Sequence, residues 1–175
     1  MKIAFVNSKG GVGKTTLAIL SCAALREAGR DAVIYDIDPQ GTSTKFAPAF
    51  GIPLSREGEI VIIDTPPRLE KTPIARAAHT ADRIVIVTTP SPAAMAATGE
   101  VVPGFVDRKA AILFNMIRCD GFALVADEVS FALPTLRSRF RERAAYQRAL
   151  LDGWKALDPR AREETLAAAL EIMSF

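Results

Sequence analysis

Short apolar runs alternate with longer mixed segments along the whole chain. Runs rich in Ile, Val and Ala predict buried strands at residues 2–7, 31–36, 59–63, 83–90 and 109–117. The segments between and after them predict helices over residues 14–29, 74–81, 91–102, 120–129, 136–148 and 159–173. Because strands alternate with helices throughout, we expect an α/β fold with a mostly parallel sheet and helices on both of its faces.

Two stretches depart from this alternation. Residues 41–58 hold Gly, Pro, Ser and Thr among few apolar residues, which predicts mostly loop with one helical turn near residues 44–50. Residues 131–135 predict a short final strand and loop around Pro134. No repeat, linker or low-complexity tract divides the 175 residues, so we expect one domain over residues 1–175.

A glycine-rich stretch lies between the first strand and the first helix. Strand, Gly-rich loop, Lys-Thr and helix is the layout of a phosphate-binding P-loop, here a deviant form with Ser8 in place of its first glycine. Backbone N–H groups of the loop and of the helix N-terminus would point at the phosphates. Lys14 would neutralise the β- and γ-phosphates, and the Thr15 hydroxyl would bind Mg²⁺. The residues predicted to hold the nucleotide here are Gly10, Gly11, Val12, Gly13, Lys14, Thr15 and Thr16.

Acidic residues close two of the apolar strands. Asp36 and Asp38 stand at i and i+2 on an extended segment, so their carboxylates point the same way from the strand end. Asp64 ends the next apolar run about 50 residues after the P-loop, as a Walker B aspartate does. Beside the P-loop, these acids would face Mg²⁺ and the γ-phosphate. Ordinary turn chemistry is the alternative for Asp38-Pro39.

The string Lys-Gly-Gly-x-Gly-Lys-Thr at residues 9–15 resembles the signature of the ParA/MinD family of ATPases. The segments 36–41 (Asp-Ile-Asp-Pro-Gln-Gly), 64–67 (Asp-Thr-Pro-Pro) and 89–92 (Thr-Pro-Ser-Pro) resemble that family as well. The resemblance runs over residues 2–153. It implies a P-loop NTPase that binds ATP and Mg²⁺ and hydrolyses ATP to ADP and phosphate.

The resemblance also assigns roles to individual residues. Lys9 would reach across a nucleotide-sandwich homodimer to the partner's phosphates, which couples ATP occupancy to dimerisation. Lys14 and Asp38 would share the catalytic role with it, Asp38 by positioning or activating the attacking water. The residues implied at the Mg²⁺ site are Thr15, Asp36 and Asp64.

Two further positions resemble the nucleotide-base side of the family's site. Asn115 lies where the family often carries an adenine-side polar residue, although an Asn at a strand end is also ordinary turn chemistry. Pro134 belongs to a loop that packs by the base in relatives. The family has more chain than this protein has in residues 41–58 and often uses that region for partner contacts, so those contacts stay open here.

Five arginines and one acid fall within residues 137–148, on a predicted helix. A basic helical face holds DNA phosphates without reading bases, and ParA relatives bind nonspecific DNA as ATP dimers. The alternative is a solvated helix whose apolar face packs on the core. The net charge of +2 does not by itself demand nucleic acid. The candidate DNA-binding residues are Arg137, Arg139, Arg141, Arg143 and Arg148.

The sequence therefore predicts a ParA-like ATPase that segregates or positions a plasmid, chromosome or protein cargo. Its slow hydrolysis would be stimulated by a ParB-like or other adaptor protein. We expect a cytoplasmic, nucleoid-associated protein, with no signal peptide, no membrane span and no N-terminal helix-turn-helix. Cys22 and Cys119 lack metal-ligand spacing and predict free thiols.

Two alternatives remain from the sequence. A MinD-like membrane-associated ATPase would need a basic amphipathic C-terminal helix, whereas residues 163–175 are acidic. A small-molecule ATP-dependent enzyme on the same fold would need an acceptor site. The sequence offers no further acid–base constellation for one.

Overall fold

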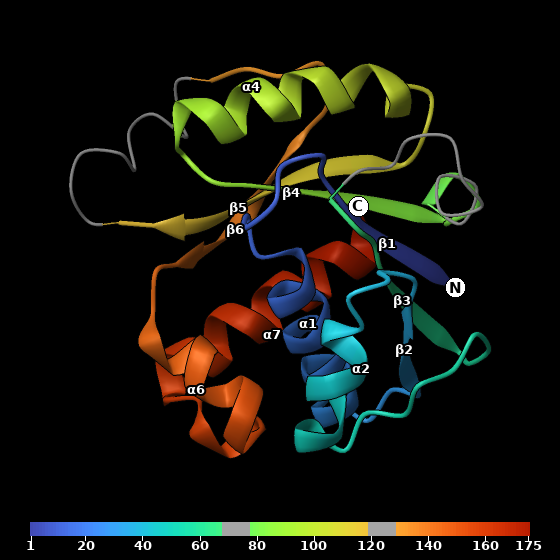
Figure 1. Cartoon of the computed structure of the whole chain (residues 1–175), viewed down its shortest axis with the longest axis vertical. Coiled ribbons are helices and arrows are strands. Elements are labelled where there is room, and N and C mark those ends of the chain that lie inside the picture. The colour runs from blue at the N-terminus through green and yellow to red at the C-terminus, as the bar shows by residue number, and fades with distance from the viewer. Residues whose placement is uncertain (68–77, 119–128) are drawn as a thin grey trace.

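Six parallel strands form one twisted sheet at the centre of the protein (Figure 1). The structure is a computed structural model that describes residues 1–67, 78–118 and 129–175. The strand order is β2-β3-β1-β4-β5-β6, and every paired ladder is parallel. The expected α/β architecture is confirmed. The strands are β1 (Lys2–Val6), β2 (Ala32–Asp36), β3 (Ile60–Asp64), β4 (Arg83–Thr88), β5 (Ala110–Ile117) and β6 (Thr135–Arg141).

Helices cover both faces of this sheet. In Figure 1, α4 lies above the sheet, whereas α1, α2, α6 and α7 lie below it. Each face has its own apolar core cluster. No helix among the described residues is long and apolar enough to cross a membrane. The helices are α1 (Lys14–Glu27), α2 (Thr42–Phe46), α4 (Pro92–Val101), α6 (Ala144–Asp152) and α7 (Pro159–Ser174), with the 3₁₀ turns η1 (Ala47–Phe50), η2 (Val102–Phe105) and η3 (Trp154–Ala156).

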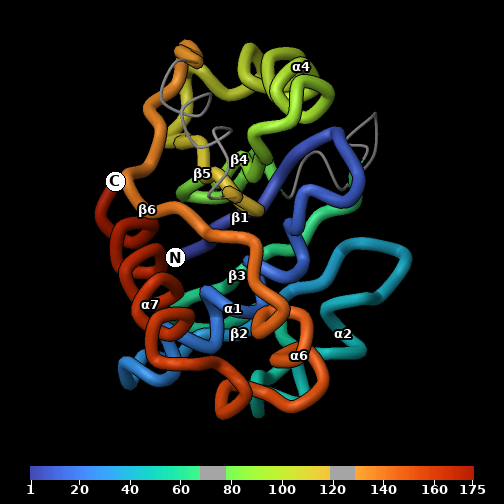
Figure 2. The backbone as a smooth tube through the Cα atoms, turned by 90° about the vertical axis from the view of Figure 1, so that its left-hand side faces the viewer, coloured from blue at the N-terminus to red at the C-terminus, as the bar shows by residue number. Residues whose placement is uncertain are grey.

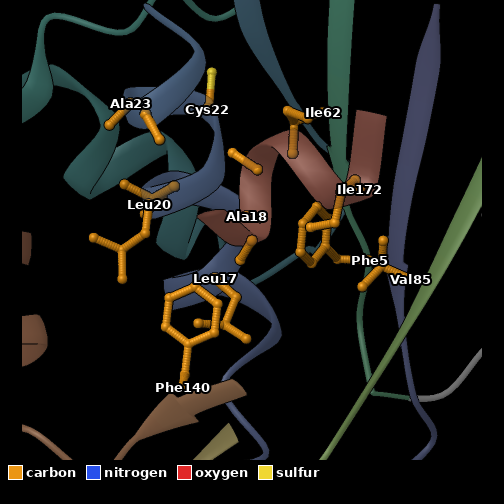
Figure 3. Close-up of a cluster of buried hydrophobic side chains, with 14 of the residues drawn as sticks. Phe5, Leu17, Ala18, Leu20, Cys22, Ala23, Ile62, Val85, Phe140 and Ile172 are labelled. Atoms are coloured by element: carbon orange, nitrogen blue, oxygen red, sulfur yellow. The ribbon is translucent and has the colours of Figure 1, made fainter. Parts of the chain in front are cut away.

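The helix α1 is buried almost all round because it packs against the sheet and is contacted by α2, α6 and α7 on the same side of the sheet. Figure 3 shows its Leu17 and Ala18 among side chains of the strands and of α7. Phe5 and Phe140, from β1 and β6, are fully buried in this cluster. Burying each such large apolar side chain contributes about 1.5–3 kcal/mol. The N-terminus of α1, which follows the glycine-rich loop, is therefore held firmly against the sheet.

A local signal explains where α4 begins, and the other predicted helices compare with the structure as follows. Ser91 caps α4 by accepting the N–H of Ala94, and Pro92 occupies the first helical position, as its fixed φ favours. The helical turn expected near residues 44–50 is present as α2 and η1. Of the helix predicted over 74–81, only residues 78–81 are described, and residues 78–79 are helical. The helix predicted over 120–129 lies outside the described residues, except for its last position.

The sequence prediction is wrong between residues 131 and 148. The final strand is β6, which begins at Thr135, where the strand was expected to end, and the helix α6 begins only at Ala144. Leu136 and Phe140 are four residues apart, and this spacing places two side chains on one face of a helix and equally on one face of a strand. Arg137 follows Leu136 and Arg141 follows Phe140, and both arginines are exposed. This change from buried to exposed between neighbouring residues is typical of a strand.

The outer edge of β6 is closed by carboxylates of α7 rather than by another strand. The register between β5 and β6 shifts within β6, and the N–H groups of Arg137 and Ser138 both donate to Glu171, each at 2.7 Å. Figure 2 shows α7 running beside β6. Binding the free N–H groups of an edge strand prevents edge-to-edge pairing with other chains. It also fixes α7 against the sheet.

Candidate nucleotide-binding site

The glycine-rich loop joins β1 to α1 at the carboxyl edge of the sheet. Gly11 and Gly13 have φ values of 79° and 95°, a left-handed conformation that glycine adopts without steric cost. Gly13 is the N-cap residue of α1, and no side chain of residues 1–67, 78–118 or 129–175 caps this helix. The first N–H groups of α1 are thus open to an anion, which the helix dipole favours.

A cavity of about 350 Å³ opens over this loop. It gathers the loop with residues from the ends of other elements, including Asp38, which the sequence singled out. Met116 and Gln147 also line it, and no local sequence pattern marked them. The lining residues are Gly10, Gly11, Gly13, Lys14, Thr15, Thr16, Asp38, Gln40, Thr42, Pro67, Met116 and Gln147.

The two lysines of the loop take different directions. The Lys14 side chain is buried, with 7% of the residue exposed, and its Nζ lies 3.4 Å from the carbonyl oxygen of Lys9. Burial lowers the pKa of Lys14, and the carboxylates of Asp64 and Asp38 oppose that effect. Lys9 itself is exposed, and its backbone N–H donates to the Asn7 side chain. Only Lys14 is therefore placed to act within the cavity of its own chain.

Asp64 is fully buried at the end of β3. Its Oδ2 accepts a 2.6 Å hydrogen bond from Ser43 Oγ, whereas its Oδ1 has no hydrogen-bond partner among the residues that the structure describes. Burial raises the pKa of Asp64 to about 6, and the nearby hydroxyls of Ser43 and Thr15 oppose the rise. An unpaired, buried carboxylate oxygen close to a threonine hydroxyl fits the oxygen ligands that Mg²⁺ takes.

The available donor atoms indicate which kind of metal site these residues would form. Within the described residues, no three His, Cys, Asp or Glu side chains gather as a metal cluster. Mg²⁺ in nucleotide sites is usually held by one or two protein oxygens together with phosphates and waters, rather than by an all-protein cage. Thr15 and Asp64 fit that pattern.

Asp36 and Asp38 have different surroundings. Asp36 Oδ2 accepts from both the N–H and the Oγ1 of Thr44, at 2.8 and 2.9 Å, and its Oδ1 accepts from the N–H of Asp38. Asp36 thus holds the start of α2, a role that the sequence did not indicate, and its part in the Mg²⁺ shell stays a prediction. Asp38 is half-buried and lines the cavity, where it can face an attacking water.

Asn115 contacts the loop itself. It is 4% exposed, and its Nδ2 donates a 2.8 Å hydrogen bond to the carbonyl oxygen of Val12. A Cβ atom at Gly13 would come within 2.1 Å of the same Nδ2, so the close approach requires glycine there. The amide donor of Asn115 thus braces the loop backbone, and the adenine-side role implied by the resemblance stays a prediction.

Pro134 is not brought to the cavity. It lies just before β6, where its carbonyl oxygen accepts the N–H of Ile112 at 2.8 Å, and it is absent from the lining residues. The segment after β6 lines the cavity instead, because Gln147 of α6 is among the lining residues.

The five candidate DNA-binding arginines do not share one helix, which corrects the prediction. Arg137, Arg139 and Arg141 belong to β6, Arg143 precedes α6, and Arg148 lies on α6. None of them lines the cavity over the loop.

The charge of Arg143 is used inside the fold, beside Glu164, which Arg141 also approaches with its Nε 3.9 Å from Oε1. The Arg143 guanidinium donates twice to Glu164, at 2.7 and 3.2 Å, and Tyr146 donates to the same carboxylate. We therefore no longer expect Arg143 to serve DNA. Arg137 and Arg148 are exposed.

A parallel sheet with a glycine-rich loop at its carboxyl edge, a buried lysine and a strand-end aspartate defines a P-loop nucleotide-binding domain. Residues 3–152 match the profile of the CobQ/CobB/MinD/ParA nucleotide binding domain. The chain belongs to this family, whose ParA and MinD members are P-loop ATPases.

Individual relatives agree with this assignment. The chain is 30% identical over 192 residues to Maintenance of carboxysome distribution protein A of Gloeobacter kilaueensis, covering 95% of this chain and 88% of that protein. Over 43 residues it is 51% identical to the Chromosome-partitioning ATPase Soj of Thermus thermophilus, covering 25% of this chain and 17% of Soj. The expected resemblance to ParA-type ATPases is confirmed.

Solved structures show the same fold at low sequence identity. The MinD cell division protein of Aquifex aeolicus has a TM-score of 0.76 and 18% identity, with 99% of this chain and 97% of that chain covered. A plasmid partition protein of Borrelia burgdorferi bound to AMPPNP has a TM-score of 0.74 and 16% identity, with 98% and 97% covered.

Proposed function

We propose that this protein is a Mg²⁺-dependent ATPase that hydrolyses ATP slowly and is stimulated by a partner protein. The observation that carries the proposal is the convergence of Lys14, Thr15 and Asp64 at the open N-terminus of α1, with Asp38 lining the same cavity. Backbone N–H groups and Lys14 would hold the β- and γ-phosphates. Asp38 would orient the attacking water. Catalysis would rest on positioning and charge neutralisation, to which Mg²⁺ contributes when bound.

We further propose that ATP joins two copies of the chain in a nucleotide sandwich. Lys9 supports this, because its exposed side chain stands beside the phosphate loop while Lys14 already serves the cavity of its own chain. In the sandwich, the Lys9 ammonium would contact the phosphates bound by the partner. It would supply positive charge that the loop of one chain lacks.

Sedimentation velocity with a slowly hydrolysed ATP analogue tests the sandwich. We expect the wild type to become a dimer, Lys9→Ala to bind the analogue yet remain a monomer, and Lys155→Ala, a change at another exposed lysine, to behave as wild type. If the wild type remains a monomer with the analogue bound, the sandwich proposal is wrong. If Lys9→Ala dimerises like the wild type, Lys9 does not have this role.

We propose that the ATP-bound dimer binds nonspecific DNA and positions a cargo through an adaptor protein. The relatives named for carboxysome distribution and chromosome partitioning support a positioning role. Exposed arginines on β6 and α6 offer charge for DNA phosphates. Each phosphate contact adds about 0.9 to the slope of log affinity against log salt. We expect Arg137→Ala and Arg148→Ala each to reduce that slope by about 1, as measured by fluorescence anisotropy, and unchanged slopes would exclude these residues.

A membrane-attached role has less support. The apolar face of α7 is already used inside the fold, where Ala161, Ala168 and Ile172 are buried. A helix that binds a membrane surface needs a free apolar face and basic flanks, whereas Glu164 and Glu171 of α7 bind the edge of β6.

A further inference from the structure

Asp64 is held by a residue from a segment that the sequence predicted as mostly loop. Ser43, on α2, donates its hydroxyl to Asp64 Oδ2 at 2.6 Å, and both residues are 0% exposed. This bond occupies one carboxylate oxygen, and within the described part of the chain Oδ1 is the oxygen without a partner. The rotation of the carboxylate, and so the placement of Oδ1, depends on Ser43.

The helix α2 is tied to two neighbouring strand ends. Asp36 and Asp64 are register partners at the ends of β2 and β3. Asp36 accepts from Thr44, and Asp64 accepts from Ser43, so consecutive residues of α2 are bound to adjacent strands. The start of α2 therefore cannot shift without disturbing one of these carboxylates.

The same short segment carries Asp38. The N–H of Asp38 donates to Asp36 Oδ1, and the carbonyl oxygen of Asp38 accepts the N–H of Gly41 at 2.9 Å. Gly41 then caps α2 with a φ of 62°. One continuous hydrogen-bonded unit, residues 36–46, thus joins the proposed water-positioning residue to the proposed metal-binding carboxylate.

We propose that Ser43 is a positioning residue. It orients the Asp64 carboxylate for the cation and couples cation binding to the position of residues 36–46. The proposal rests on the Mg²⁺-dependent nucleotide binding proposed above. Side chains that orient a metal ligand typically change metal affinity about 10- to 100-fold when removed. A buried serine with a purely structural role would affect the stability of the fold without affecting the cation.

The test measures how Mg²⁺ strengthens binding of a fluorescent ATP analogue. We expect Ser43→Ala to raise the Mg²⁺ concentration for half-maximal effect about 10- to 100-fold, while affinity for the analogue in EDTA stays near that of wild type. Ser21→Ala is the matched control, because Ser21 is an equally buried serine on α1 whose hydroxyl has no hydrogen-bond partner in the described ranges of the chain. It should leave the Mg²⁺ dependence unchanged.

The outcomes separate this inference from the proposed function. If Mg²⁺ does not strengthen nucleotide binding in the wild type, the proposed function fails. If Mg²⁺ acts normally on the wild type and equally on Ser43→Ala, the positioning role of Ser43 is refuted, even where urea denaturation shows lower stability.

A second measurement needs no variant to fold. Hydrogen exchange on the wild type should show that residues 42–46 exchange more slowly with ATP analogue and Mg²⁺ than with ATP analogue and EDTA. The α7 amides serve as an internal reference that should not respond. Equal exchange of residues 42–46 under both conditions would overturn the coupling.

Discussion

Replacing Asn115 with alanine is expected to weaken the binding of ATP and of inorganic tripolyphosphate to the same extent. The Asn115 amide reaches the P-loop backbone at Val12 across 2.8 Å. It lies directly against Gly13, the N-cap residue of α1. The variant removes a brace from the loop that holds phosphate, so any ligand that binds through phosphates should lose affinity.

The size of the effect follows from the state of the Val12 carbonyl. Leaving a buried acceptor unpaired costs about 1–3 kcal/mol. In the free variant the loop can escape this cost by relaxing until the carbonyl reaches water. Phosphate binding must then restore the braced conformation at up to that cost. Since about 1.4 kcal/mol changes affinity tenfold, we expect a loss of about 5- to 150-fold.

Competition against a fluorescent ATP analogue measures both ligands in one assay. If ATP loses affinity in Asn115→Ala while tripolyphosphate does not, Asn115 serves the adenine base and the bracing argument is wrong. Thr165→Val is the control for deleting a buried polar group elsewhere. The Thr165 hydroxyl donates to the carbonyl oxygen of Ala161 on the same helix, α7, at 2.7 Å. Its loss should lower stability without weakening either ligand.

Two further predictions concern stability in urea. Gly153→Ala should destabilise the fold by more than ~2 kcal/mol, because a Cβ there would stand 2.2 Å from the carbonyl oxygen of Ala49. Gly99→Ala should raise the free energy of unfolding by about 0.5–1 kcal/mol, because Gly99 lies in a helix with open space around it. Equal changes in stability for Gly153→Ala and Gly99→Ala would contradict this. Burial raises the pKa of Asp64 from 3.8 to about 6, so between these values the folded protein binds more protons than the unfolded chain. Stability of the nucleotide-free protein should therefore fall by up to ~3 kcal/mol as pH rises through this window, and Asp64→Asn should remove that decrease.

The parts of the site that the sequence predicted are those with local signals. The glycines, Lys14 and Thr15 are adjacent in the chain, and Asp64 follows an unbroken apolar strand. Their meeting follows from parallel topology, which brings the carboxyl ends of strands to one edge. The same rule places Asp38, which follows β2, beside the loop.

The parts that the sequence missed depend on contacts between distant segments. Asn115 and Val12 are 103 residues apart, and Ser43 and Asp64 are 21 apart, so no short-range pattern encodes either bond. Met116 has a φ of 55°, a strained value for a residue with a side chain, which no composition rule indicates. The helix predicted over residues 136–148 was wrong for a different reason. Two apolar residues four positions apart, Leu136 and Phe140, lie on one face of a helix and equally on one face of a strand.

Two asparagines fix the loop from which Lys9 would reach a second chain in the proposed sandwich. Asn7 is fully buried and binds Val87 O and Thr98 Oγ1 at 2.7 and 2.9 Å, while its Oδ1 accepts the N–H of Lys9. Asn115 braces the other end of the loop. The backbone of Lys9 is thus fixed to β4 and α4, and only its side chain is free to extend beyond the loop. Removing that side chain leaves both braces and Lys14 in place, so loss of dimerisation in Lys9→Ala, with ATP binding retained, would be a property of its ammonium group and not of a disturbed phosphate site.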